Sequence, residues 1–198
     1  MLGQALKLSD SKKTKELTAR VMTLNSEESK AQGMINDLLH EHSTDTFFNE
    51  LDAPLVLAAS QLSSNQVGAA LRTLDRVKPI DFGLEDGLLS NYMRALAYLR
   101  LRRPEDGALE FSAVVAHRGQ KPWNPILVMS QLGLARAYAM QHHVAKSRAA
   151  YETFFADWKT ADPDLPILNQ PKRNTRSCCG RAIGDGCRID SREDRNIL

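Results

Sequence analysis

Cysteine is absent from the first 177 of the 198 residues, and aromatic residues make up only 6% of the chain. No run of about 18 apolar residues occurs, so the sequence contains no candidate membrane span. The first ten residues lack the apolar core of a signal peptide. With 26 basic and 24 acidic residues, the chain also lacks the strong positive charge typical of nucleic-acid-binding proteins. These absences favour a cytoplasmic protein that binds neither a membrane nor nucleic acid.

Catalytic and metal-binding motifs are also missing from the sequence. There is no Gly-rich phosphate loop, no nucleophile elbow and no kinase catalytic loop. Asp81-Phe82-Gly83 spells a kinase metal-binding motif, but without a catalytic loop upstream it is interpreted as a turn. The histidines of His40-Glu41-His42 and His142-His143 lie only two and one positions apart, whereas ligands on one helix face lie three or four residues apart. We therefore expect no enzyme activity, no metal and no cofactor.

The last 28 residues differ in composition from the rest. All three cysteines, Cys178, Cys179 and Cys187, lie there, and seven basic residues outnumber four acidic ones. The segment has no aromatic residue, and its arginines could touch RNA or acidic lipid only weakly among the interspersed acids. We predict a repeat domain over residues 5–170 and a poorly ordered tail over 171–198, with free thiols rather than a zinc site.

Apolar residues in the body recur at the three- and four-residue spacing of amphipathic helices. Leu17, Val21 and Leu24, for example, predict a buried stripe on the first helix. Pro54 lies inside a helical pattern, and the helix must bend or restart there because proline cannot donate an interior backbone hydrogen bond. The predicted helices cover residues 12–24, about 27–40, 44–62, 66–77, 88–101, 104–116, 124–141 and from about 144 to 160.

Two of these helix pairs are copies of one another. Ala95-Leu96-Ala97-Tyr98 recurs 40 residues later as Ala135-Arg136-Ala137-Tyr138. At the same offset the small residue Gly107 matches Ser147, and the aromatic Phe111 matches Tyr151. Tetratricopeptide repeats have about 34 residues and place small and aromatic residues in this order. The pattern predicts an all-α fold of about four tetratricopeptide-like helix pairs, stacked as a short right-handed solenoid.

The order of several motifs gives a more specific resemblance. Four segments follow one another along the chain. They are His117-Arg118-Gly119, the Ala-x-Ala-Tyr helix, the helix that contains Tyr151–Trp158, and the segment Ala161–Leu168. Over residues 5–172 the chain resembles the C-terminal tetratricopeptide region of acidobacterial eukaryotic-like serine/threonine protein kinases, and of winged-helix regulators from the same bacteria. In that family an effector domain precedes the repeats. The resemblance therefore suggests a truncated remnant whose tail has diverged or is read out of frame.

Partner contacts are expected on the first helix of each pair, which lines the concave side of such a solenoid. The repeat register places three residues of each of two helices on that side. Trp123 lies in the inserted loop, where it either contacts a partner or packs over the start of the next helix. The predicted partner-contact residues are Tyr92, Leu96, Arg100, Trp123, Leu132, Arg136 and Met140.

Two functions remain open at this point. The preferred one is a non-catalytic scaffold or adaptor module that binds a protein or peptide partner, or that self-associates. The alternative is a regulatory fragment of a bacterial serine/threonine kinase or transcriptional regulator whose effector domain is missing from this chain. The helical framework specifies shape, so it does not identify the partner.

Overall fold

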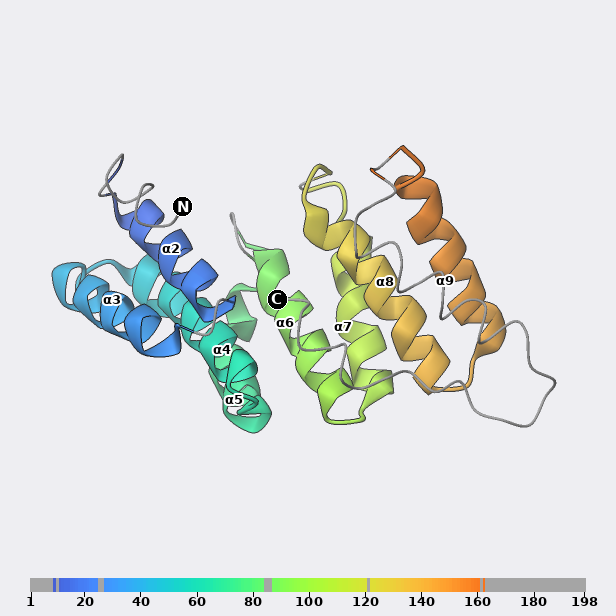
Figure 1. Ribbon diagram of the computed structural model, residues 1–198, viewed down its shortest axis with the longest axis horizontal. Helices are drawn as coiled ribbons and strands as arrows, with labels where there is room; N and C mark the ends of the chain where they lie inside the picture. The colour runs from blue at the N-terminus through green and yellow to red at the C-terminus, as the bar shows by residue number, and fades with distance from the viewer. Residues whose placement is uncertain are drawn as a thin grey trace. The chain divides into compact units, whose positions relative to one another are not determined.

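The computed structural model describes residues 9, 11–24, 27–83, 87–120, 122–160 and 162, and the predicted tail lies outside this range. In the described part of the chain every regular element is a helix (Figure 1). The chain divides into two compact units, one ending at Ala97 and the other beginning at Tyr98. The boundary falls inside helix α6 (Gly87–Arg100), so each unit is described by itself. That residues 5–170 form a single domain stays a prediction.

The first unit contains two helical hairpins and most of α6. Helices α2 (Lys12–Leu24) and α3 (Glu28–Glu41) form one hairpin, and α4 (Ala53–Ser63) and α5 (Val67–Val77) form the other. A shared core joins the first hairpin to α4 through Ala31, Ile35, Leu38, Phe48 and Val56, among others. A second core lies between α4, α5 and α6, with Leu55, Leu62, Leu74, Val77 and Met93 among its buried members.

Pro54 changes the helix, but in another way than the predicted bend or restart. The helix that begins at residue 46 does not break there but widens into a π-helical turn, Phe48–Asp52, before α4 continues. The Ala53 amide donates to the Phe48 carbonyl, five residues back instead of four. This wider turn removes the clash that a proline ring makes with the carbonyl four residues before it. The helix therefore accommodates Pro54 by changing its hydrogen-bond pattern locally.

The predicted apolar stripe of α2 is wrong. Leu17 and Val21 are 45% and 40% exposed, whereas Glu16 is fully buried beside the buried Ala19; the Leu24 side chain lies outside the described residues. Glu16 tolerates burial because Arg20 donates a hydrogen bond to its carboxylate and the Lys13 ammonium lies 2.8 Å from it. Paired charge thus lies on the buried face of α2, and two aliphatic side chains face solvent.

The second unit contains α7 (Pro104–Ala116), α8 (Pro125–Met140) and α9 (Val144–Asp157), close to their predicted bounds. Leu132 and Ala135 of α8 pack against Tyr151 and Phe154 of α9. Ser147, predicted where the paired helices approach closely, is buried and donates a hydrogen bond to the Ala135 carbonyl at 2.9 Å. This side-chain bond adds to the packing that holds α8 and α9 together.

The turns between α4 and α5, α6 and α7, and α8 and α9 share one backbone motif. Asn65, Arg102 and His142 each adopt φ near +60°, which places them in the left-handed region. In each turn the next amide bonds back five residues, as Arg103 does to Tyr98 at 2.9 Å and His143 to Tyr138 at 2.9 Å. These are Schellman C-caps, which usually carry glycine at the left-handed position. Arg102 has no such freedom, so its turn holds conformational strain.

Replacing Arg102 by glycine should stabilise the protein by about 0.5–1 kcal/mol, because glycine adopts a positive φ without steric strain. The matched control is Asn65→Gly, where the change should be smaller because asparagine already tolerates this region. Thermal unfolding followed by circular dichroism measures both variants. An Arg102→Gly midpoint at or below that of the parent would contradict the assigned strain.

Helices α7 and α8 of the second unit approach each other closely at Gly133. A Cβ atom added to Gly133 would lie 2.3–2.5 Å from three atoms of the Phe111 ring. Phe111 is fully buried, so the ring has little room to move away. Glycine at position 133 is therefore a packing requirement that allows the aromatic ring of α7 to lie against the backbone of α8.

Gly133→Ala should destabilise the protein, because overpacking costs roughly 1–3 kcal/mol whereas helix propensity returns only about 1 kcal/mol. Gly33 provides the control, since nothing lies within 4 Å of an added Cβ there. Gly33→Ala should stabilise the chain by about 0.5–1 kcal/mol. Chemical denaturation of both variants tests the contrast, and equal effects of the two alanines would refute the close contact.

Candidate partner-binding surface

The three predicted contact residues of α6 differ in exposure. Tyr92 and Leu96 are buried, with 5% and 8% of their surface accessible, whereas Arg100 is half-buried near the end of the helix. The first two therefore offer little surface to a partner in the folded chain. The repeat register predicts that these residues lie on one face of α6. Whether that face is exposed depends on what packs against it.

The residues of α8 show the same division. Leu132 is 1% exposed and lies in the core with Tyr151 and Phe154, and Arg136 is 5% exposed. Met140, near the end of α8, is half-buried. Leu132 thus packs inside the α8–α9 hairpin. The repeat register predicts that it faces a groove, but the register contains no information about this packing. Partner contact by any of these residues stays a prediction.

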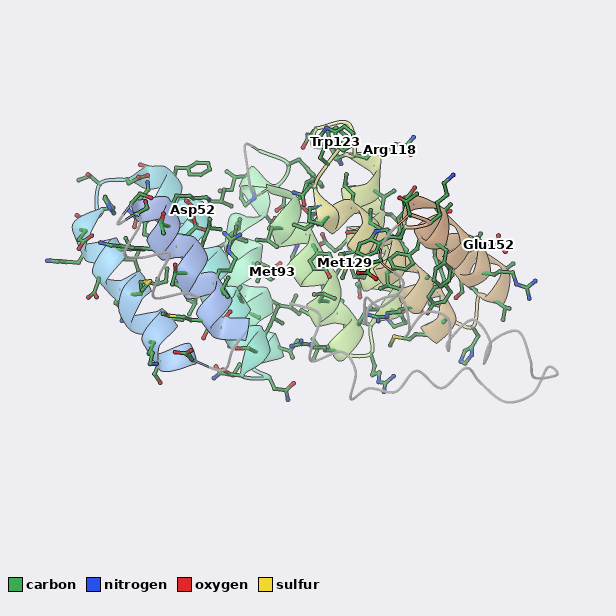
Figure 2. All side chains as sticks on the ribbon, turned by 45° about the horizontal axis from the view of Figure 1, so that its top comes forward. Asp52, Met93, Arg118, Trp123, Met129 and Glu152 are labelled. Carbon is green, nitrogen blue, oxygen red and sulfur yellow. The ribbon has the colours of Figure 1, made fainter. Side chains whose placement is uncertain are left out.

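Trp123 is the most accessible of the seven, with 94% of its surface exposed. It lies one residue before the N-cap of α8, where Asn124 accepts a hydrogen bond from the Ile126 amide at 3.0 Å. An apolar residue in this position often packs against the fourth residue of the helix, here Val128. Val128 packs instead with the α8–α9 core. The packing alternative for Trp123 is therefore wrong, and its indole faces solvent (Figure 2).

The loop around Trp123 is positively charged and conformationally restricted. Pro122 and Pro125 flank the tryptophan closely and fix their own φ angles. Arg118 of the same loop is exposed and forms no ion pair with any residue that the structure describes (Figure 2). The sequence of this loop, residues 117–124, contains no acid. A backbone restricted in this way loses less entropy when the loop is bound, and tryptophan is enriched among interface anchors.

Asp81 has a structural role, and Asp81-Phe82-Gly83 forms the predicted turn. Its carboxylate accepts hydrogen bonds from the guanidinium of Arg94, which is fully buried. Ser90 and Asn91 of α6 donate to the same carboxylate, and Arg94 also donates to the Leu74 carbonyl at 3.3 Å. Asp81 therefore neutralises a buried cation and ties the turn to α6.

A cleft between α2 and α3, which sequence reasoning missed, has a volume of about 450 Å³. Met34 and Leu38 give it an apolar lining, and Gly33 leaves it open. Its two lysines are engaged, Lys15 with Glu41 at 3.6 Å and Lys30 with Glu27 at 2.6 Å. Asp37 also lines it and is exposed, without an ion pair among the described residues.

The carboxyl group of Asp45, close to the α2–α3 hairpin, has a lowered pKa. The Lys12 ammonium donates a hydrogen bond to Asp45, and the Phe48 amide donates a second at 3.0 Å. Both bonds hold the pKa of the Asp45 carboxyl below its ordinary value of 3.8, and the Lys12 bond has the larger effect. The shift lies far from neutral pH and reflects the attachment of α2 to the segment after α3.

Within the described ranges, no group of three histidine, cysteine, aspartate or glutamate side chains could hold a metal ion. The same residues include no helix long and apolar enough to cross a membrane. The three cysteines lie outside the described residues, so the prediction of free thiols is not tested.

Comparison with known proteins supports the fold. No family model and no curated protein matches the chain. Among solved structures, it is similar to the tetratricopeptide-like repeats of a kinesin light chain from Podosopora anserina, with a TM-score of 0.64 and 18% identity over 93% of this chain and 92% of that one. A point variant of that protein gives a TM-score of 0.66 and 17% identity, over 93% and 90% of the two chains. The predicted all-α, tetratricopeptide-like repeat fold is confirmed.

Single-tryptophan variants should report the exposure of Trp123 directly. With Trp158→Phe, the remaining Trp123 should emit like a solvated indole and be quenched strongly by iodide, which its cationic loop attracts. With Trp123→Phe, the remaining Trp158 should be quenched less, because it is half-buried and stacks on Phe154 at a ring distance of 5.7 Å. Equal iodide quenching of the two variants would show that Trp123 is covered.

Proposed function

We propose that this chain is a non-catalytic module that binds a protein or peptide partner. The observation that carries the proposal is a 94% exposed tryptophan on a restricted cationic loop of a tetratricopeptide-like repeat fold. Stacked helical repeats commonly present extended binding surfaces, and tryptophan is enriched among residues that dominate interface energetics. Of the other predicted contacts, Arg100 and Met140 keep partly accessible side chains. A cytoplasmic setting belongs to the same proposal.

Arg100 and Met140 would contribute different chemistry to a bound peptide. A guanidinium pairs with a carboxylate in two parallel hydrogen bonds, and methionine adapts to irregular apolar surfaces. Tyr92, Leu96, Leu132 and Arg136 are too buried to act in the same way without rearrangement. We assign them to support of the helices that carry the accessible residues.

Quantitative affinity purification with the full chain as bait tests the module. Proteins captured by the parent and by Leu109→Ala should be depleted with Trp123→Ala; Leu109 is a matched control because it is 70% exposed. For a purified partner, isothermal titration should show Trp123→Ala weakening binding about tenfold or more. The same partners bound with the same affinity by Trp123→Ala would reject Trp123 as an anchor.

A regulatory role beside a kinase or winged-helix domain is the second candidate. The order of motifs from His117 to Leu168 supports it, since this order resembles the repeats of such proteins. Sequencing the DNA upstream of the Met1 codon, together with the transcript, tests this role. A kinase or winged-helix frame directly upstream supports it, and an unrelated upstream sequence rejects it.

A further inference from the structure

Two surface features of this chain complement one another chemically. One is the loop with exposed Trp123 and Arg118, and the other is the cleft between α2 and α3, which contains Asp37. We propose that the Trp123 loop of one copy docks into the α2–α3 cleft of a second copy. The inference rests on the proposed protein-binding function and deepens it by naming the partner.

The cleft has the size and lining that an indole requires. Its volume of about 450 Å³ lies within the range of small-ligand pockets. Met34 provides the accessible apolar atoms, since Leu38 beneath it is 1% exposed, and a methionine sulfur interacts favourably with an aromatic ring. Gly33 leaves the side-chain space above α3 empty, since an added Cβ meets nothing within 4 Å. Trp123 would therefore enter without displacing a packed side chain.

Charge complementarity selects the orientation. Arg118 beside Trp123 has no ion pair among the described residues, and neither has Asp37 in the cleft. The two lysines of the cleft already pair with Glu41 and Glu27, so they offer less repulsion to an incoming cation. An Arg118–Asp37 pair across the interface would satisfy both charges when Trp123 is seated.

Each contact of this kind joins two different surfaces, the loop of one copy and the cleft of the other. A chain that lacks only the loop can still receive a neighbour, and a chain that lacks only the cleft can still donate. Mixing the two kinds of variant therefore distinguishes loop-to-cleft docking from other modes of self-association.

Sedimentation velocity of the full chain over a concentration series provides the first test, under reducing conditions so that the three cysteines form no intermolecular disulfides. The parent should show concentration-dependent association that Trp123→Ala weakens about tenfold or more. Leu109→Ala, which shortens another exposed apolar residue, should associate like the parent. A parent that remains monomeric up to about 1 mM would overturn the inference.

Complementary variants provide the decisive test. Trp123→Ala removes the anchor, and Gly33→Leu fills the cleft while favouring the helix. Each variant alone should sediment as a monomer, and an equimolar mixture should form a heterodimer that grows no further. A mixture that stays monomeric, while the parent associates, would overturn the head-to-tail arrangement. Circular dichroism confirms that both variants remain helical.

A charge exchange tests the orientation independently. Arg118→Glu and Asp37→Lys should each weaken association, and the double variant should restore it, since the reversed charges attract again. No restoration in the folded double variant would overturn the assigned pair. Failure of self-association together with retained binding of another protein at Trp123 would leave the proposed function intact. Loss of both would reject the proposed function as well.

Discussion

Close contact between a glycine and an aromatic ring sets the packing of the second unit. Phe111 reaches the backbone of α8 only because Gly133 has no side chain, and the two helices are fixed in register by that contact. On the other side of α8, Ser147 repeats the principle with a small side chain that bonds to the Ala135 carbonyl. The loop from His117 to Asn124 joins α7 and α8. Trp123 is accessible in this loop because Val128 packs with the α8–α9 core and forms no staple with the indole.

Much of the fold could be predicted from the sequence because local signals agree with one another. Pro104 and Pro125 mark helix starts, and the Ala-x-Ala-Tyr motif with its offset of 40 residues identifies the paired helices. The bounds of α2, α5 and α7 follow within a residue. A local change of the helix at Pro54 could also be predicted, although its π-helical form could not.

The surface was harder to predict because periodicity fixes the angle of a residue around its helix and not what lies opposite. Leu17 and Leu132 illustrate the two possible errors. Leu17 is apolar, yet its face of α2 is exposed, since Arg20 and Lys13 allow Glu16 to take the buried side. Leu132 lies in the expected register, yet the core formed with Tyr151 covers it. The α2–α3 cleft depends on an unfilled space at Gly33, which no pattern of residues within one helix reveals.

The π-helical turn at Phe48–Asp52 has a consequence for how the repeats differ in length. A π turn holds one residue more than the α turn that it replaces, so side chains before it are rotated by about 100° relative to those after it. The corresponding left-handed residues Asn65, Arg102 and His142 are likewise unevenly spaced, 37 and then 40 residues apart. The π turn precedes Asn65 and lies in neither interval, whereas the loop that carries Trp123 lies in the longer one. The chain thus holds added residues in two kinds of place, inside a helix and inside a loop. A residue added inside a helix rotates the side chains on one side of it relative to those on the other. A residue added to the loop lengthens a segment that is exposed to solvent.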